Sequence, residues 1–173
     1  MTIRLEDGSR LPNWVVLLKK PLELSEETCS DMAKRAWPLW HPATDSIVST
    51  PPWFMIKFDD KYWFELYSYD NRFFPKGQEP PKELFPQKEL RDAIKQHNGW
   101  ISIDITYDPP DEMVANGHMA KLVAEFTRLG GLAVLFPPAR GAVKLTLEAC
   151  NCLRSEAPST AFKLHGSHIH SLE

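Results

Sequence analysis

The residues best placed for chemistry are polar side chains on one face of a predicted strand. Residues 100–107 alternate in type, so that three isoleucines share one face, which must be the core face. The other face carries an indole, two hydroxyls and a carboxylate, from Trp100, Ser102, Asp104 and Thr106. Aspartate is depleted in strands, so some interaction should compensate for its unfavourable strand propensity at position 104. A cross-strand lysine or a hydroxyl is the simpler explanation, and a bound ligand is the alternative.

A further pair of carboxylates follows in the next loop. Asp108 and Asp111 flank Pro109 and Pro110, and carboxylates placed in this way can hold a cation. Asp111 also directly precedes a predicted helix, where the simpler role is to cap the helix N-terminus. An enzyme built on this sequence would use Asp104, Asp108 and the proline-rich loops.

Soft metal ligands gather near the C-terminus. Cys150, Cys152, His165, His168 and His170 are side chains of the types that bind zinc. Residues i and i+2 diverge on a helix, so Cys150 and Cys152 can chelate together only if the helix breaks between them. We therefore expect no metal site and no cofactor, and we keep Cys150, Cys152, His165 and His168 as the alternative ligand set.

Aromatic side chains are concentrated in residues 53–69, which predict a β-hairpin around Asp59-Asp60. In the second arm, Trp63, Glu65 and Tyr67 share one face, and only one face of the strand needs to belong to the core. The hairpin therefore has a surplus aromatic face.

Two explanations account for that surplus. The outer face is a partner surface, as exposed apolar patches of this kind often are, or the loop with Phe73, Phe74 and Phe85 folds over it. If the surface stays open, we expect a homodimer through the hairpin. The predicted binding residues are Trp63, Tyr67, Trp100, Ser102, Asp104 and Asp108.

Recognised catalytic motifs are missing from the sequence. It contains no Gly-x-Ser-x-Gly, His-Glu-x-x-His, phosphate-binding loop or Rossmann fingerprint. His118 and Glu125 share one face of a predicted helix, which we expect to be solvated. The favoured function is a non-enzymatic domain that binds a protein or a small ligand, with a small enzyme at Asp104 and Asp108 as the alternative.

Composition limits the partners and the compartment. Lys plus Arg number 20 and Asp plus Glu number 23, scattered along the chain, so a nucleic-acid surface is not expected. Apolar runs such as residues 132–136 are too short to span a membrane, and residues 1–7 lack the features of a signal peptide. Three cysteines fit a reducing compartment. We expect a cytoplasmic protein without nucleic-acid or membrane partners.

Hydrophobic periods and helix-ending residues place the elements that hold these side chains. The apolar run 14–18 predicts a strand buried on both faces. Ser25 is the predicted N-cap of a helix that ends at Pro38. Glycines at positions 99 and 130–131 end two further helices and precede strands. Residues 143–153 predict a final helix.

This order of elements predicts an α+β fold. We expect a two-layer sandwich with about five strands and helices mostly on one face, built on a ferredoxin-like βαββαβ plan extended by a further helix and strand. A chain of 173 residues is enough for one core. We expect a single domain over residues 1–157 and a poorly ordered tail over residues 158–173.

Three stretches resemble an uncharacterised family of bacterial domains of unknown function. They are residues 15–21, residues 99–104, and residues 119–126 leading into 131–137. In that family a Trp-hydrophobic-Ser-hydrophobic-Asp strand precedes a helix and a buried strand that ends in proline. The resemblance covers most of residues 14–157. It implies a bacterial origin and a compact domain of helices and strands, and it supplies no catalytic residues.

Overall fold

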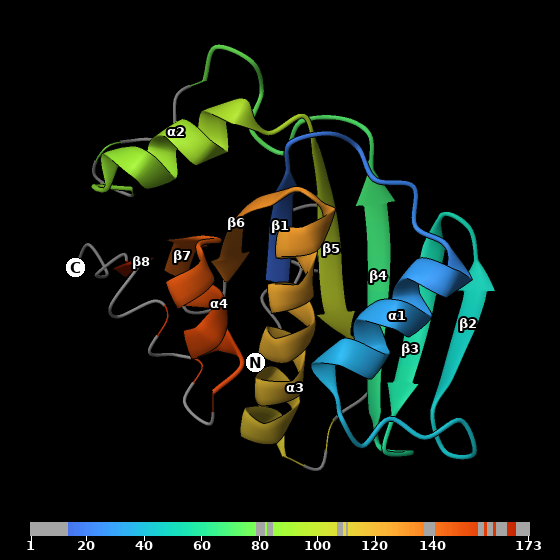
Figure 1. Cartoon of the computed structure of the whole chain (residues 1–173). Helices are drawn as coiled ribbons and strands as arrows, with labels where there is room; N and C mark the ends of the chain where they lie inside the picture. Colours follow the sequence, from blue (N-terminus) through green and yellow to red (C-terminus); the bar gives the residue numbers. More distant parts are fainter. Residues whose placement is uncertain are drawn as a thin grey trace.

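The computed structural model describes residues 14–78, 82, 85–106, 109, 111–136, 141–155, 158, 161 and 166–168. These residues form an α+β fold around one eight-stranded antiparallel sheet (Figure 1). The strands are β1 (Trp14–Leu18), β2 (Ser46–Thr50), β3 (Trp53–Phe58), β4 (Tyr62–Tyr69), β5 (Gly99–Ile105), β6 (Gly131–Phe136), β7 (Gly141–Lys144) and β8 (Gly166–His168). The helices are α1 (Glu26–Ala36), α2 (Lys88–Gln96), α3 (Glu112–Glu125) and α4 (Leu147–Leu153), and a short 3-10 helix (Phe126–Leu129) follows α3.

The first strand lies near the middle of the sheet, whose order is β2-β3-β4-β5-β1-β6-β7-β8. All five residues of β1 are buried. Val16 pairs with Ile101 of β5 on one side and with Val134 of β6 on the other. The prediction of a strand buried on both faces is confirmed, and its unbroken apolar sequence follows from that burial.

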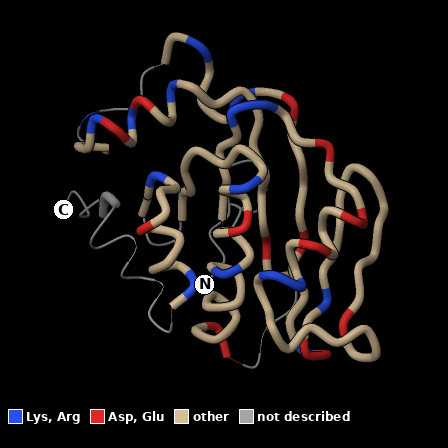
Figure 2. Tube along the Cα trace, viewed as in Figure 1, with Lys and Arg blue, Asp and Glu red and all other residues tan. Residues whose placement is uncertain are grey.

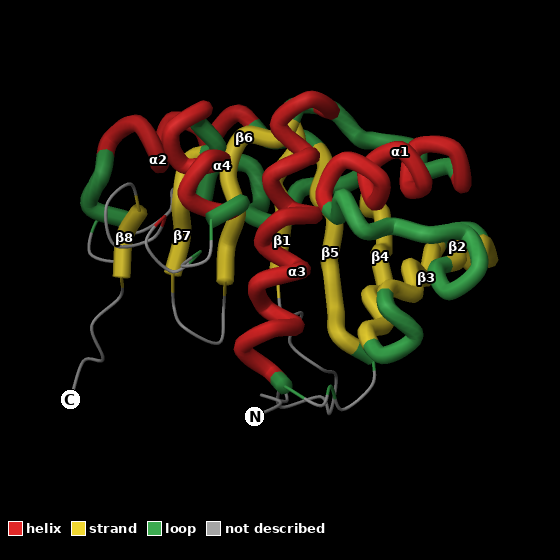
Figure 3. The backbone as a smooth tube through the Cα atoms, turned by 60° about the horizontal axis from the view of Figure 1, so that its bottom comes forward, coloured by secondary structure: helices red, strands yellow, loops and turns green. Residues whose placement is uncertain are grey.

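Three helices cover one face of the sheet, and the fourth packs on the other. The larger core cluster joins α1, α3 and α4 to the face that carries Val16, Phe64 and Ile103. In Figure 1 these three helices lie in front of the strands, and Figure 3 shows α1 and α3 beside the same strands from another side. Leu90 and Ile94 of α2 pack on the opposite face, over β1, β6 and β7. The expected bias of the helices toward one face is therefore confirmed.

Capping side chains begin the helices where the sequence predicted them. Ser25 Oγ accepts a hydrogen bond from the backbone N–H of Thr28 at the start of α1. Asp111 Oδ1 accepts from the N–H groups of Met113 and Val114 at the start of α3. Asp111 is therefore an N-cap, as the simpler of its two predicted roles required.

The sheet has more strands than the sequence predicted, and the last helix begins later in the chain than predicted. Residues 141–144 form β7, in which Val143 pairs with Val134 of β6, and the helix starts only after Thr146, its N-cap. A four-residue strand has no clear period of its own, and its pairing with β6 decides its conformation. The backbone of residues 166–168 adds β8 beside β7. The expected number of about five strands is therefore wrong.

A buried aspartate fixes the hairpin turn to the loop before β2. Asp45 is 5% exposed. Its carboxylate accepts hydrogen bonds from the backbone N–H of His41 at 2.5 Å and of Asp59 at 2.8 Å, and from the hydroxyl of Thr44 at 3.2 Å. Asp59 and Asp60 both have positive φ angles. The carboxylate thus stabilises a turn whose backbone dihedral angles lie in the left-handed region, which residues other than glycine seldom adopt.

Replacing Asp45 with alanine is expected to destabilise the protein by about 2 kcal/mol, because two backbone N–H groups lose their acceptor in a buried site. Thermal unfolding measures the effect, and Thr44→Ala is the control because it removes only the exposed member of the same network. If Asp45→Ala were as stable as Thr44→Ala, the carboxylate would not be holding the turn.

A buried ion-pair cluster joins the three helices of the larger layer. The Glu125 side chain of α3 is 3% exposed. Its carboxylate lies 2.9 Å from Arg35 Nε of α1, 2.9 Å from an Arg154 guanidinium nitrogen after α4, and 3.7 Å from Arg128 Nε. The expectation that Glu125 lies on a solvated helix face is therefore wrong: the arginines of neighbouring helices make its burial possible.

Candidate functional site

The sheet has an open half on the face where α2 packs. Among the described residues, α2 and the loop before it cover β1, β6, β7 and the Trp100 end of β5, and no residue of β2, β3 or β4 belongs to that cluster. The side chains that these three strands direct to this side are half-buried or exposed. We call this surface the open face. Its members are Val48, Trp53, Met55, Lys57, Trp63, Glu65 and Tyr67, together with the half-buried Asp104 of the neighbouring strand β5.

Two carboxylates lie side by side on the open face. Glu65 of β4 is directly opposite Asp104 of β5 in the pairing register. The Tyr67 hydroxyl donates a hydrogen bond to Glu65 Oε1 at 3.2 Å. Burial raises the pKa of the Tyr67 hydroxyl, and the negative charges of Glu65 and Asp104 raise it further. This part of the open face therefore brings two carboxylates and a phenol hydroxyl together on neighbouring strands.

An aromatic ring of the open face already holds a cation. Lys57 Nζ lies 5.2 Å from the centroid of the Trp63 ring, directly across from it in the register. The same ammonium group is paired with the carboxylate of Asp60. Trp53 and Tyr67 face each other across β3 and β4. Aromatic side chains therefore stand on both sides of Glu65 along β4.

The loop after β4 covers one end of this side of the sheet. The Tyr69 and Trp100 rings stack with centroids 3.7 Å apart, and Phe73 packs edge-on against Trp100 at 5.0 Å. Trp100 Nε1 donates a hydrogen bond to Asn71 Oδ1 at 3.0 Å. The loop therefore closes over Trp100, and the open face lies outside that cover.

A buried histidine fixes this loop to α2. His97 is fully buried. Its Nε2 accepts a hydrogen bond from the N–H of Phe74 at 3.2 Å, so Nδ1 carries the proton and donates to the carbonyl of Ile94. Arg72 donates to the carbonyls of Phe74 and His97. Burial lowers the pKa of His97, the Ile94 hydrogen bond opposes this shift, and the charge of Arg72 adds to it. The junction therefore requires a neutral imidazole.

Three of the predicted binding residues, Trp63, Tyr67 and Asp104, come together on the open face. Ser102 lies on the same side of β5 but is buried, at 4% exposed. Trp100 lies on the same side of β5 but beneath the loop. Asp108 lies outside the described residues.

Glu65 and Met55 belong to the open face but are missing from the predicted binding residues. A signal for Glu65 was present, because it alternates with Trp63 and Tyr67. Its position opposite Asp104 could not be read from the sequence, because a long loop and α2 separate β4 from β5 and leave the register open.

The predicted alternative metal ligands are only partly described. Cys150 and Cys152 both lie in α4, which runs without a break from Leu147 to Leu153. Cys150 is buried and lies 2.8 Å from the Thr127 hydroxyl, so the break that joint chelation required does not occur. His165 and the side chain of His168 lie outside the described residues. Within the described part, no three His, Cys, Asp or Glu side chains gather as a metal site.

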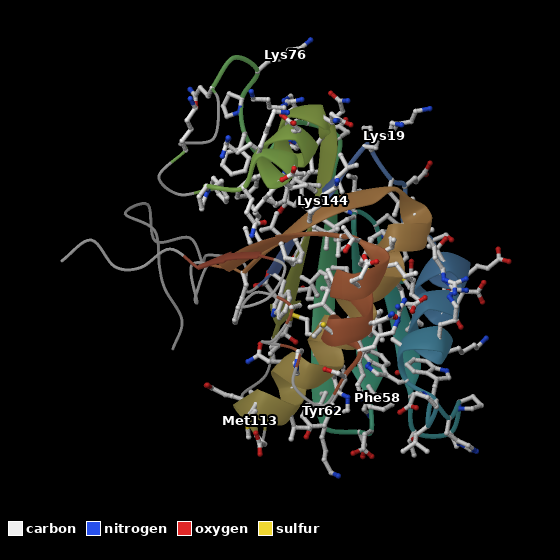
Figure 4. All side chains as sticks on the ribbon, turned by 60° about the vertical axis from the view of Figure 1, so that its left-hand side comes forward. Lys19, Phe58, Tyr62, Lys76, Met113 and Lys144 are labelled. Atoms are coloured by element: carbon white, nitrogen blue, oxygen red, sulfur yellow. The ribbon has the colours of Figure 1, made fainter. Side chains whose placement is uncertain are left out.

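His118 lies in an aromatic cluster at the hairpin end of the sheet. Its ring centroid is 4.9 Å from those of both Phe58 and Tyr62. Figure 4 places these two residues at the same end of the molecule as Met113 and far from Lys19. The Nδ1 atom of His118 is buried and has no hydrogen-bond partner among the described residues. Burial lowers the pKa of His118, and Lys121 lowers it further, against the opposite effect of Asp59.

Replacing His118 with phenylalanine is expected to stabilise the protein by about 1 kcal/mol, because it keeps a ring in the cluster and removes a buried polar atom that no described residue hydrogen-bonds. This corresponds to a melting temperature about 2–4 °C higher. His118→Gln is the control, since it retains polar atoms at the same place and should bring no gain. A clear loss of stability in His118→Phe would show that the imidazole makes a favourable interaction.

No known protein family matches the chain, and no curated protein or solved structure is significantly similar to it. In the part of the chain that the structure describes, none of the helices is long and apolar enough to cross a membrane.

Proposed function

We propose that this chain is a binding domain that engages its partner through the open face. The observation that carries this proposal is the set of half-exposed aromatic side chains on β3 and β4, Trp53, Trp63 and Tyr67, outside the core cluster that α2 builds on this side of the sheet. Large aromatic side chains on a rigid surface are the residues that most often dominate binding energy. A sheet face also holds them in fixed positions, which limits the entropy lost on binding.

Site-specific photocrosslinking in the native host tests this proposal. A photoreactive amino acid replaces Met55 on the open face or, as the control, Lys34 on the exposed side of α1. We expect a discrete adduct from position 55 that is reduced by Trp53→Ser and by Tyr67→Ser, and no such adduct from position 34. Equal yields from the two positions, or no adduct from position 55, would refute the proposal.

A second copy of this chain is one partner that the open face could bind, as the sequence-based expectation of a homodimer states. Its adduct would have twice the mass of the chain. Sedimentation of the parent and of Trp53→Ser over a wide concentration range distinguishes this case, because only the parent should then associate. A parent that stays monomeric would exclude the homodimer and leave a different partner.

The opposed carboxylates of Glu65 and Asp104 also support a second candidate function, a small enzyme on the same face. Paired carboxylates can act together as general acid and base. For such an enzyme, Glu65→Gln would abolish turnover while leaving binding of the substrate in place. The sequence-based version of this alternative used Asp104 with Asp108, and the structure offers Glu65 as a neighbour for Asp104.

The ferredoxin-like plan is an architectural proposal. Strands β4, β5, β1 and β6 are adjacent and antiparallel, and α1 and α3 pack on one face of them. This arrangement supports the split βαβ plan. In that case strands β2 and β3 and helix α2 are additions to the ferredoxin-like plan.

A further inference from the structure

We propose that β2 is a dimerisation edge, at which a second copy of this chain pairs its own β2 antiparallel to the first. The contact runs between the two backbones and joins the two sheets into one continuous sheet across a twofold axis. This inference goes beyond the proposed function, because it concerns the outer edge of the sheet and not the open face.

The free edge of β2 is the first argument. β2 is the terminal strand of the sheet, and among the described strands it pairs with β3 alone. In Figure 1 it is the outermost strand on its side, and no helix is drawn beyond it. In an antiparallel pair, every second residue directs its backbone N–H and C=O groups away from the neighbouring strand. These groups of β2 point outward, and no described residue forms a backbone hydrogen bond with them.

The edge also lacks the features by which proteins prevent strand pairing. Such features are charged side chains, an internal proline, a β-bulge or a covering element. Residues 46–50 are Ser, Ile, Val, Ser and Thr, and Figure 2 shows the outermost strand without a charged residue. The register between β2 and β3 is unbroken from Ser46 to Thr50, and four of these five residues are exposed. An accessible, uncharged edge of this kind is a template for a further strand.

The sequence of β2 favours a second copy of this chain as the partner. A twofold axis brings each residue near it close to its own copy, so a charge there would meet a like charge, and β2 carries none. The antiparallel register that uses all five residues places Val48 opposite Val48 of the second copy. It also places Ser46 opposite Thr50. Pairs of β-branched side chains and pairs of hydroxyls are both favourable across neighbouring strands, so β2 is complementary to itself.

Charge exchange at Ser49 tests this pairing. Ser49 is exposed and shares a strand face with Ile47, which packs on the helix side, so its substitution leaves the open face unchanged. In the proposed register the two copies of residue 49 are diagonal neighbours, about 7–8 Å apart. Ser49→Lys and Ser49→Asp should therefore each stay monomeric at concentrations at which the parent dimerises. An equimolar mixture of the two variants should dimerise again, because opposite charges then meet.

Sedimentation velocity of the full chain measures these equilibria. A single strand pair is a small interface and its dimer is expected to be weak, so the concentration range extends to about 1 mM. We expect Ser49→Lys to raise the dissociation constant of the dimer at least about tenfold. Asn151→Lys is the matched control, since it adds the same charge at an exposed position of α4, which Figure 1 shows far from β2. It should leave the dimer unchanged.

Disulfide trapping tests the register without relying on charge. Val48→Cys places two thiols directly opposite each other at the twofold axis and should give a covalent dimer on air oxidation. Thr50→Cys is the control on the same strand, because the two copies of residue 50 would lie more than about 13 Å apart, beyond the reach of a disulfide. The parent sets the background from its native cysteines, of which Cys29 and Cys150 are buried.

Three results would overturn the inference: a parent that stays monomeric up to about 1 mM, equal association of Ser49→Lys and Asn151→Lys, or equal trapping through positions 48 and 50. Sedimentation of Trp53→Ser separates pairing through β2 from a homodimer through the open face. A dimer that persists in Trp53→Ser and is lost in Ser49→Lys supports the inference. A dimer that persists in Ser49→Lys and is lost in Trp53→Ser would reject it and support the open face as the interface.

Discussion

Replacing Arg35 and Arg154 together with methionine is expected to lower the free energy of unfolding by about 3–5 kcal/mol. The Glu125 carboxylate is almost completely buried, and among the described residues these two guanidinium groups are its nearest cations. Without them it would depend on Arg128, which is farther away and whose side chain is 67% exposed. Urea unfolding followed by circular dichroism measures the loss.

Adding Glu125→Leu to this double variant should recover most of the lost stability, because an apolar side chain in the helix layer needs no cation. Arg128→Met alone is the matched control and should change the free energy of unfolding by less than about 1 kcal/mol, since its partner keeps two closer arginines. A double variant as stable as the parent would show that Glu125 is not held by these contacts.

Acidification below about pH 6.5 is expected to destabilise the protein through His97 and His118. Burial lowers the pKa of both imidazoles in the folded state. The unfolded chain therefore binds protons that the folded chain does not. The stability contributed by the neutral rings is fully present above the ordinary histidine pKa and is lost as the pH falls below it. Each histidine can contribute at most about 1.4 kcal/mol per pH unit to this loss.

Urea unfolding at several values between pH 7.5 and pH 5 measures this slope. His97→Gln and His118→Phe should each reduce it, and the two effects should add, because the histidines lie in different parts of the fold. His41→Gln is the control, since His41 is exposed. A slope that stays the same when both histidines are replaced would assign the acid sensitivity to other groups.

Elements with a strong period of their own could be predicted from the sequence. The apolar run of β1, the stripe of α1 between Ser25 and Pro38, and the aromatic arms of β3 and β4 all lie where the sequence placed them. The strand β7 could not be predicted in this way, because only its neighbour β6 gives residues 141–144 an extended conformation. The burial of Glu125 could not be predicted either, since its two closer arginine partners come from α1 and from the end of α4.

Part of the candidate site could also be predicted from the sequence. The alternation in β4 and β5 identified Trp63, Tyr67 and Asp104, because strand faces follow directly from a period of two. The extent of the open face was not predictable. It depends on where α2 packs, and the apolar side chains Leu90 and Ile94 show that α2 has a buried face without showing which part of the sheet it covers.

The position of β1 in the sheet constrains how the chain can fold during its synthesis. The hairpin of β3 and β4 can close as soon as it is made, but β1 has no neighbour until the ribosome has passed β5, and its other side waits for β6. Until then the apolar strand β1 has both edges unpaired, and such a strand is a target for chaperones and for aggregation. Because the contacts that complete this sheet join residues far apart in the sequence, its assembly is expected to be slow.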